Sequence, residues 1–145
     1  MPLYTTYLAF LKNANYNPVN IFPNELKETL IYYVRSNRGN DEVAPSKALL
    51  EWLARIKSEF GKEWKKVFAA EYWRHYKRKY LRQLRTSPEA DRWMKKIAEE
   101  SKRTNVVLVC LEKDHMHCHR RLLAEGMSQK FGAQYKGELN QSHIG

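Results

Sequence analysis

An unbroken apolar run, Val-Val-Leu-Val-Cys-Leu at residues 106–111, constrains the fold of this chain more than any other segment. The run is rich in β-branched valine and has no polar position. Strands of this kind occur where helices cover both faces of a parallel sheet, because neither face of the sheet then meets water. We therefore predict that residues 106–111 form the central strand of a small, mostly parallel, Rossmann-like sheet in a three-layer α/β domain.

Weaker strand patterns lie on both sides of this run. Residues 3–7 are rich in Thr and Tyr and predict a first strand, and residues 19–22 predict a short second strand. A strand at residues 133–136 would complete a right-handed βαβ unit after the central strand. Residues 23–34 allow two interpretations, which are a helix that carries Leu26, Leu30 and Tyr33, or a strand over residues 30–34.

The middle of the chain is predicted to be largely helical. A polar loop at residues 36–45 leads to Ser46, which is a suitable N-cap for an amphipathic helix that ends near Gly61. A second helix is predicted over residues 64–84, with an aromatic stripe on one face. A third helix begins at Ser87-Pro88, where a capping side chain precedes a proline at the first helical position.

Length and composition place residues 1–145 in one globular domain with a tail at residues 139–145. Apolar residues make up 43% of the sequence, which is enough for a packed core, and no run approaches the roughly 18 apolar residues of a membrane span. The first residues lack the layout of a signal peptide, so we expect a cytoplasmic protein. Two cysteines do not form a disulfide scaffold, and a reducing compartment keeps them as thiols, except in some hyperthermophile proteins.

The segment after the central strand carries the strongest functional signal. Cys110 lies at the end of that strand, Asp114 is placed to cap the next helix, and Cys118 falls in the first turn of this helix. Parallel sheets bind ligands where strand ends meet helix N-termini. The helix dipole, His119 and Arg120 are expected to lower the pKa of the Cys118 thiol, which would make it a nucleophilic or redox-active cysteine.

Three interpretations of these residues remain open. The two cysteines can be small buried hydrophobes, as free cysteines often are. They can instead form a catalytic or redox site, in which Cys118 attacks, Cys110 resolves, and His119 and Arg120 lie beside them. As a third interpretation, Arg120, Arg121 and the helix N-terminus bind an anion while the cysteines take no part.

A metal site is a fourth interpretation, and the sequence disfavours it. Such a site would combine Cys110 and Cys118 with some of His115, His117 and His119. Their spacing matches no standard zinc pattern, and alternate residues of a helix do not share a face. We therefore expect no metal and no cofactor.

The segment from Val106 to Glu125 resembles the signature of the uncharacterised family catalogued as domain of unknown function 488. The specific element is Cys110, seven intervening residues, and then Cys118-His119-Arg120. Ala44-Pro45-Ser46, residues 73–84 and the helix start at Ser87 resemble further parts of the family, so the likeness covers roughly residues 43–125. The resemblance implies one α/β domain with the cysteines at the sheet edge and no established reaction, and one branch of the family has neither cysteine. The signature positions are Cys110, Glu112, Asp114, Cys118, His119 and Arg120.

The formal charge of +10 predicts attraction to anionic ligands or polyanions. Residues 61–103 contain 14 Lys and Arg against 6 Asp and Glu, so they carry +8 of this charge. The aromatic stripe of the second helix is expected to lie in the core, opposite a row of arginines that can follow phosphates. The lead hypothesis is a ligand-binding or thiol-active site at the cysteines, and the alternative is a nucleic-acid or polyanion-binding module. The arginines of this row are Arg74, Arg78, Arg82 and Arg85.

Overall fold

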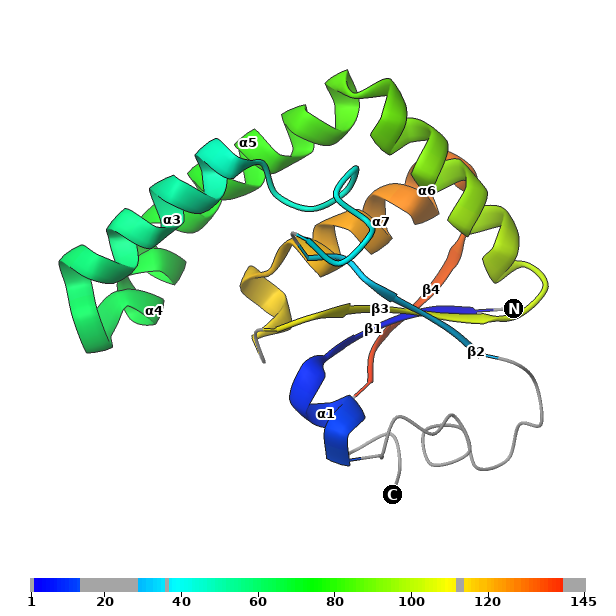
Figure 1. Cartoon of the computed structure of the whole chain (residues 1–145), viewed down its shortest axis with the longest axis horizontal. Helices are drawn as coiled ribbons and strands as arrows, with labels where there is room; N and C mark the ends of the chain where they lie inside the picture. Colours follow the sequence, from blue (N-terminus) through cyan, green and yellow to red (C-terminus); the bar gives the residue numbers. More distant parts are fainter. Residues whose placement is uncertain (1, 14–28, 36, 112–113, 140–145) are drawn as a thin grey trace.

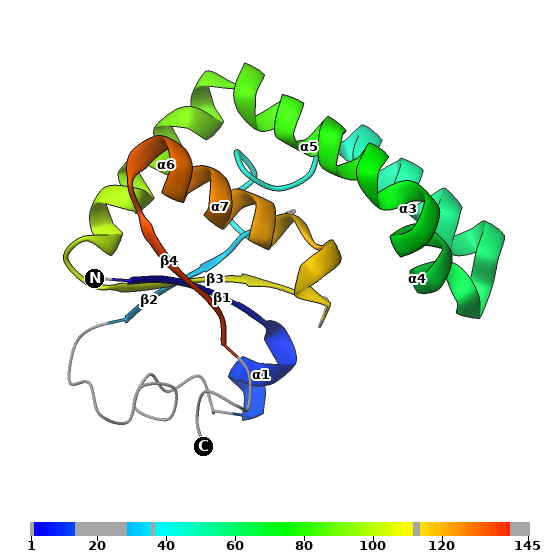
Figure 2. The ribbon, with the colours of Figure 1, turned by 180° about the vertical axis from the view of Figure 1, so that it is seen from behind.

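Figures 1 and 2 show a computed structural model of the chain, in which residues 2–13, 29–35, 37–111 and 114–139 are described. A twisted sheet lies across the molecule. Helices α6 (Pro88–Ser101) and α7 (His119–Phe131) cover one face of the sheet, and α1 (Leu8–Asn13) lies on the other side. This is the predicted α/β fold in three layers. The strand predicted at residues 19–22 lies outside the described ranges. Of the tail predicted at residues 139–145, only Leu139 is described, and it is buried in the core cluster that contains Phe10.

The described part of the sheet has four strands, and all of them are parallel. The order is β2-β3-β1-β4, so β3 pairs on both sides, with Leu30 and Leu3 beside Val106. All residues of β3 are buried, which confirms the predicted central strand. The bounds are β1 (Pro2–Tyr7), β2 (Thr29–Tyr33), β3 (Asn105–Cys110) and β4 (Gln134–Glu138).

Residues 29–33 form strand β2, so the strand interpretation of this region is confirmed and the helical one is wrong here. The strand pairs in continuous register with β3, from Thr29 beside Asn105 to Tyr33 beside Val109. Helix propensity differs between ordinary residues by roughly half a kcal/mol each. Pairing with a buried central strand outweighs a preference of that size, because it satisfies the backbone and buries side chains together.

Strand β3 packs side chains on both faces of the sheet. Val106 and Leu108 belong to the larger core cluster, which lies under the helices. Val107 and Val109 point to the opposite face and pack with Phe10 of α1. The continuous apolar pattern of β3 therefore reflects two separate cores, one on each side.

Helices α3 (Lys47–Phe60), α4 (Trp64–Val67) and α5 (Trp73–Thr86) form an arm that extends beyond the sheet (Figures 1 and 2). Ser46 and Ser87 cap α3 and α6 as predicted, each with its hydroxyl oxygen 3.1 Å from a backbone nitrogen three residues later. The helix predicted over residues 64–84 is interrupted by one π-helical segment, η2 (Phe68–Tyr72), and follows a 3-10 turn, η1 (Gly61–Glu63). None of the helices in the described ranges has both the length and the apolar character needed to cross a membrane.

Helix α5 is bound to the chain segment that precedes α3. The hydroxyl of Tyr80, a fully buried side chain, donates to the carbonyl oxygen of Val43 at 2.6 Å. The side-chain amide of Gln83 donates to the carbonyl oxygen of Ala44 at 2.7 Å and accepts from the backbone N–H of Ser46 at 2.8 Å. These bonds satisfy the backbone of a segment without regular structure and fix it against α5.

We predict that Tyr80→Phe lowers the free energy of unfolding by about 1–2 kcal/mol, because it leaves the buried Val43 carbonyl without its donor. Urea unfolding followed by circular dichroism measures this change. The control is Tyr76→Phe, which removes a hydroxyl from the same buried stripe and leaves the Val43 bond intact. An equal loss in both variants would contradict the role of this bond.

Candidate functional site

Cys110, Cys118 and His119 come together where β3 ends and α7 begins. Cys110 is the last residue of β3, and the chain returns through a 3-10 turn, η3 (His115–His117). Cys118 precedes α7 with an extended backbone (φ −134°, ψ 146°), and His119 is the first residue of the helix. The sequence placed Cys118 inside the first helical turn, but it lies one residue earlier.

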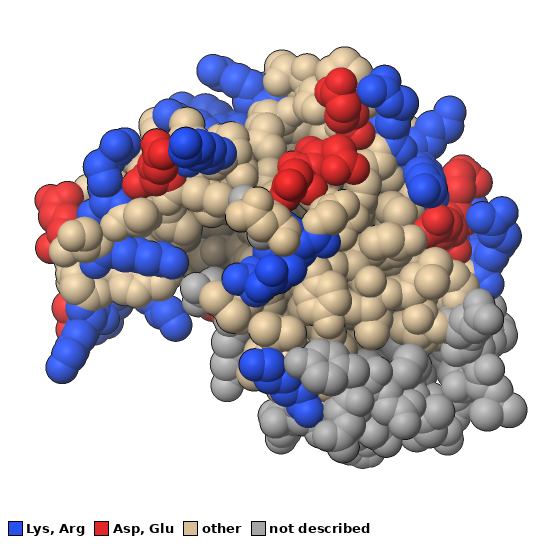
Figure 3. Space-filling view, in the orientation of Figure 1, with Lys and Arg blue, Asp and Glu red and all other residues tan. Residues whose placement is uncertain are grey.

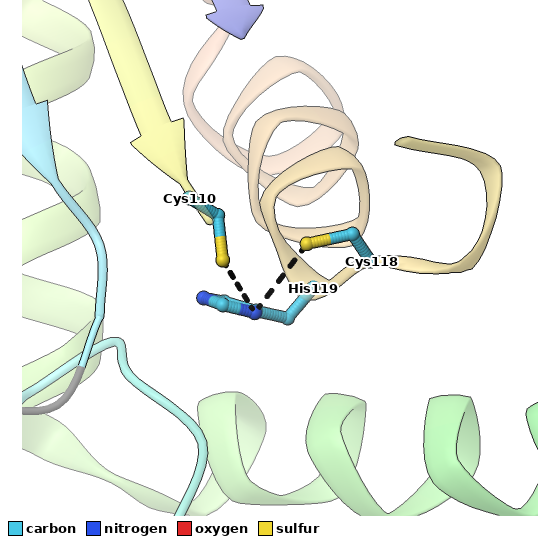
Figure 4. A group of neighbouring side chains, drawn as sticks. All are labelled: Cys110, Cys118 and His119. Carbon is cyan, nitrogen blue, oxygen red and sulfur yellow. Dashed lines mark hydrogen bonds between the residues drawn. The ribbon is translucent and has the colours of Figure 1, made fainter. Parts of the chain in front are cut away.

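The side chains of these three residues point toward one another (Figure 4). Nδ1 of His119 lies 3.9 Å from Sγ of Cys110 and 3.8 Å from Sγ of Cys118. The two sulfur atoms and a ring nitrogen all lie within 4.8 Å of one another, and all three residues are buried. These three residues do not need to share a helix face, because Cys110 ends a strand and Cys118 lies outside the helix.

The ring of His119 is held in one orientation by a backbone carbonyl group. Its Nε2 atom lies 2.5 Å from the carbonyl oxygen of Val34, the residue that follows β2. A carbonyl oxygen only accepts hydrogen bonds, so Nε2 carries the proton. In the neutral ring Nδ1 then has a free lone pair, and this lone pair faces both sulfur atoms. The edge-on contact between the Tyr80 and His119 rings, with centroids 5.4 Å apart, supports the same orientation.

The pKa of Cys118 is raised to about 12. The main cause is its hydrogen bond to Cys110, followed by burial, and His119 acts in the opposite direction. The neighbouring Cys110 thiol and the burial of the site therefore both favour the protonated form of Cys118. The lowered pKa expected for Cys118 from the helix dipole, His119 and Arg120 is therefore not found.

A cavity of about 290 Å³ opens beside the cluster. Figure 3 shows a hollow between the helical arm and the rest of the molecule. The arm supplies five apolar or aromatic side chains to this lining, whereas the chemically reactive groups come from the β3 and α7 side. The lining residues are Arg35, Pro45, Leu50, Leu53, Lys57, Trp64, Lys65, Phe68, Tyr76, Cys110, Leu111, Asp114, His117, Cys118 and His119.

Three basic side chains in this lining favour an anionic ligand. Arg35 comes from the end of β2, Lys57 from α3 and Lys65 from α4. The ammonium groups of Lys57 and Lys65 lie 4.6 and 5.9 Å from the ring centroid of Trp64, so one aromatic side chain holds both of them near the cavity.

Asp114 and His117 are joined by a side-chain hydrogen bond in the wall of the cavity. The carboxylate of Asp114 accepts from the backbone N–H of Met116 at 3.1 Å and contacts Nδ1 of His117 at 2.8 Å. Burial opposes the charged form, but the bonds and charge of His117 outweigh it and lower the pKa of Asp114. Asp114 therefore caps η3, whereas the sequence assigned it to the following helix. His117 lies edge-on to the ring of Trp73.

Arg120 and Arg121 are not among the residues that line the cavity. Arg120 is fully buried, and its Nε and Nη2 atoms donate to the two carboxylate oxygens of Glu138 at 3.1 and 2.6 Å. Although burial favours the neutral form, the bond to Glu138 raises the pKa of Arg120. Arg121 donates to Glu125 at 3.1 Å and to the Met116 carbonyl at 3.2 Å. Both guanidinium groups thus have protein partners, and their binding of an anion stays a prediction.

Sequence reasoning did not identify Arg35, Glu138 or the Val34 carbonyl as parts of the site. Arg35 and Val34 follow β2, so they would have been candidates if residues 30–34 had been assigned to a strand, because ligands bind at the carboxyl ends of parallel strands. Glu138 ends β4, and nothing in the sequence pairs it with Arg120. That pairing depends on the three-dimensional arrangement of α7 and β4.

The basic face of α5 lies where the sequence predicted it. Arg74, Arg78, Arg82 and Arg85 are exposed. On the opposite side of the helix, Tyr76, Tyr80 and Leu84 are buried, so these side chains belong to the core and do not stack on a ligand at the surface.

Comparison with known proteins gives a match to a protein family. A family model described as "Domain of unknown function DUF488" matches residues 18–127, which is more than half of the 145 residues. The matched region includes β2, the arm, β3 and the cluster of Cys110, Cys118 and His119, whereas β1 and β4 lie outside it. No curated protein and no solved structure matches the chain significantly.

We predict that Arg120→Met lowers the free energy of unfolding by about 3–5 kcal/mol, because Glu138 would remain as a buried carboxylate without its partner. Urea unfolding measures the loss. The control is the double variant Arg120→Met with Glu138→Leu, which removes both charges and should regain most of the stability. A double variant as unstable as the single one would show that the unpaired charge is not the cause.

Proposed function

For this chain, which belongs to the family of domain of unknown function DUF488, we propose a dithiol site that exchanges with the disulfide bond of a small anionic ligand. The contact of His119 Nδ1 with both sulfur atoms carries this proposal. Cys110 and Cys118 supply the thiols, His119 accepts a proton, and the cavity admits the ligand. The proposal takes the protein to work in a reducing cytoplasm, which returns both cysteines to thiols.

The exchange takes place in two steps. In the first step a thiolate attacks the disulfide bond of the ligand, a mixed disulfide forms, and one half of the ligand leaves as a thiolate. In the second step the other cysteine attacks the protein sulfur of this mixed disulfide. The Cys110–Cys118 disulfide forms and the second half of the ligand leaves. Two electrons pass from the dithiol to the ligand, and the two protons of the cysteines pass by way of His119 to the departing thiolates.

We assign the first attack to Cys110 and the second to Cys118. The contact with Cys110 and burial raise the pKa of the Cys118 thiol, so Cys118 keeps its proton and is the less suitable first nucleophile. This order is the reverse of the one suggested by the sequence, in which Cys118 attacks. The reversal follows from the position of Cys118 outside the helix and next to a second thiol.

A purely structural role for the cysteines explains less of the arrangement. Two small apolar side chains would fill the same positions without a histidine between them. His119 is only 5% exposed, and burial of an imidazole costs free energy unless its polar atoms are bonded. The Val34 carbonyl satisfies one nitrogen and leaves the other for the sulfur atoms. The presence of this polar group supports a chemical use of the thiols.

The lining of the cavity supports an anionic ligand with an apolar or aromatic body. The aromatic and aliphatic side chains of the arm provide apolar surface, and Arg35, Lys57 and Lys65 provide positive charge. A net positive field also raises the local concentration of anions around the molecule.

We predict that the reduced, metal-free protein reacts with the aromatic dicarboxylate disulfide 5,5′-dithiobis(2-nitrobenzoate) and ends as an internal disulfide. The wild type should release two thionitrobenzoate ions per chain, one for each step, and mass spectrometry should show a chain that has lost two hydrogens. Cys110→Ala and Cys118→Ala should each release one ion and stop at the mixed disulfide.

The urea-unfolded wild type provides the control, because its two thiols then react independently. A folded wild type that keeps nitrobenzoate adducts on both cysteines, or that reacts only after unfolding, would contradict the proposal. In His119→Gln, loss of the proton acceptor should slow the exchange by about 10²-fold, which is the lower end of the contribution of a positioned base.

The exposed arginine row of α5 favours a second candidate function, the binding of nucleic acid or another polyanion. Arg74, Arg78, Arg82 and Arg85 are all exposed along one helix, and no acidic residue lies between Glu71 and Glu89 to neutralise them. Each contact between such a side chain and a phosphate releases a bound counterion, so this binding would weaken as salt rises.

We predict that the double variant Arg78→Glu with Arg82→Glu elutes from heparin at a lower salt concentration than the wild type. For RNA binding, the slope of the logarithm of the binding constant against the logarithm of the salt concentration should become shallower by about one to two, which corresponds to the loss of about one to two phosphate contacts. The control is Lys95→Glu with Lys96→Glu, which makes the same charge change at two exposed positions of α6. Equal effects of the two pairs would show that net charge, and not the α5 face, determines retention.

A further inference from the structure

We infer that Cys110, Cys118 and His119 form a three-ligand site for a thiophilic divalent metal ion of the zinc class, with the fourth coordination position open to the cavity. The inference goes beyond disulfide exchange and does not depend on it, because it requires only that the three donor atoms converge. It rests on the spacing of the donors, the orientation of the imidazole and the position of the cavity.

The donor atoms have nearly the spacing that a tetrahedral zinc ion requires. Zinc–sulfur bonds of about 2.3 Å and zinc–nitrogen bonds of about 2.0 Å place neighbouring ligand atoms roughly 3.5–3.8 Å apart. The nitrogen–sulfur separations here are 3.9 and 3.8 Å, and the three donors lie within 4.8 Å of one another. Small side-chain adjustments are therefore sufficient to bring the three atoms to coordination distances.

The imidazole already has the tautomer and the support of a metal ligand. Ligating histidines almost always donate their other ring N–H to a carbonyl or carboxylate oxygen, which fixes the ring and makes the free nitrogen more basic. His119 donates from Nε2 to the Val34 carbonyl, which leaves Nδ1 for the metal. The carbonyl is itself well anchored, because the backbone N–H of Val34 donates to the Val109 oxygen at 2.9 Å.

The fourth position of the proposed site would face the cavity. Within the described parts of the chain, no fourth Cys, His, Asp or Glu joins the cluster, and all three members line the cavity. Three protein ligands and an open position are typical of catalytic zinc sites, whereas structural zinc sites are closed by four protein ligands. Two thiolates would neutralise a divalent ion, so Arg35, Lys57 and Lys65 would not repel the loaded site.

The position of the cluster explains why the sequence lacks a standard zinc pattern. Short motifs place two ligands in one turn or on one helix face. Here Cys110 ends a strand, while Cys118 and His119 begin a helix, and the β3–α7 connection brings the two ends together. Seven residues separate the cysteines because η3 lies between them.

Titration of the reduced, chelator-treated protein with Co²⁺ tests this inference. We expect one bound ion per chain, a thiolate-to-cobalt charge-transfer band in the near ultraviolet, visible bands of tetrahedral intensity, and displacement of all bands by Zn²⁺. Cys110→Ser and Cys118→Ser should each remove about half of the charge-transfer intensity, because each removes one of two thiolates. His119→Gln should weaken binding by more than about tenfold, since even the loss of an outer-shell partner costs that much.

The matched control is His117→Gln, which changes a histidine that lines the same cavity but does not belong to the cluster. Its cobalt spectrum and affinity should equal those of the wild type. The inference would be overturned by an absence of charge-transfer bands, by bands that persist unchanged in Cys118→Ser, or by equal losses in His117→Gln and His119→Gln.

A measurement on the wild type alone covers the case in which the variants do not fold. One equivalent of Zn²⁺ should slow the labelling of both cysteines by a thiol reagent, and a chelator should restore it. Unchanged labelling would overturn the inference whatever the variants do. Disulfide exchange is measured on the metal-free protein, so the two proposals can fail separately. If exchange fails but the cobalt bands appear, only the exchange proposal is refuted. If exchange occurs but the cobalt bands do not appear, only the metal site is refuted.

Discussion

Parallel pairing of β3 with both β1 and β2 is the constraint on which the rest of the structure depends. It buries β3 on both faces and directs its carboxyl end to the same edge as the end of β2. Because parallel strands end at the same edge, Cys110 and the Val34 carbonyl lie close together, and α7 must begin there to cross back over the sheet. His119 then reaches the Val34 carbonyl and both sulfur atoms from the first residue of α7.

The helical arm gives this site a partly enclosed environment. Helices α3 to α5 extend beyond the sheet, and their apolar and aromatic residues form one side of the cavity wall. The bonds of Tyr80 and Gln83 hold the segment before α3 against α5. The two basic features of the chain are also separate. Arg35, Lys57 and Lys65 line the cavity, whereas the arginine row of α5 faces solvent.

The proposed disulfide exchange and the proposed metal binding would depend on the same chemical property of the site. Two soft sulfur atoms beside a neutral imidazole nitrogen are nucleophilic toward a disulfide bond and are also good ligands for a thiophilic cation. The two uses exclude each other at any moment, because a sulfur that coordinates a metal is not free to attack. Arg120 supports the site from a distance, since its buried pair with Glu138 binds the first turn of α7 to the end of β4.

Residue patterns alone were sufficient to predict the α/β class, the central strand, the caps at Ser46 and Ser87, and the choice of Cys110, Cys118 and His119 as candidate site residues, because these depend on local periodicity, local hydrogen bonds and residue type. Features that depend on long-range contacts became evident only in the tertiary structure. Residues 29–33 form a strand because they pair with β3, Arg120 forms a buried ion pair with Glu138, and Arg35 lies in the cavity lining. The tertiary structure also placed Cys118 beside Cys110 outside the helix, where a second buried thiol raises a pKa that the helix dipole alone would lower.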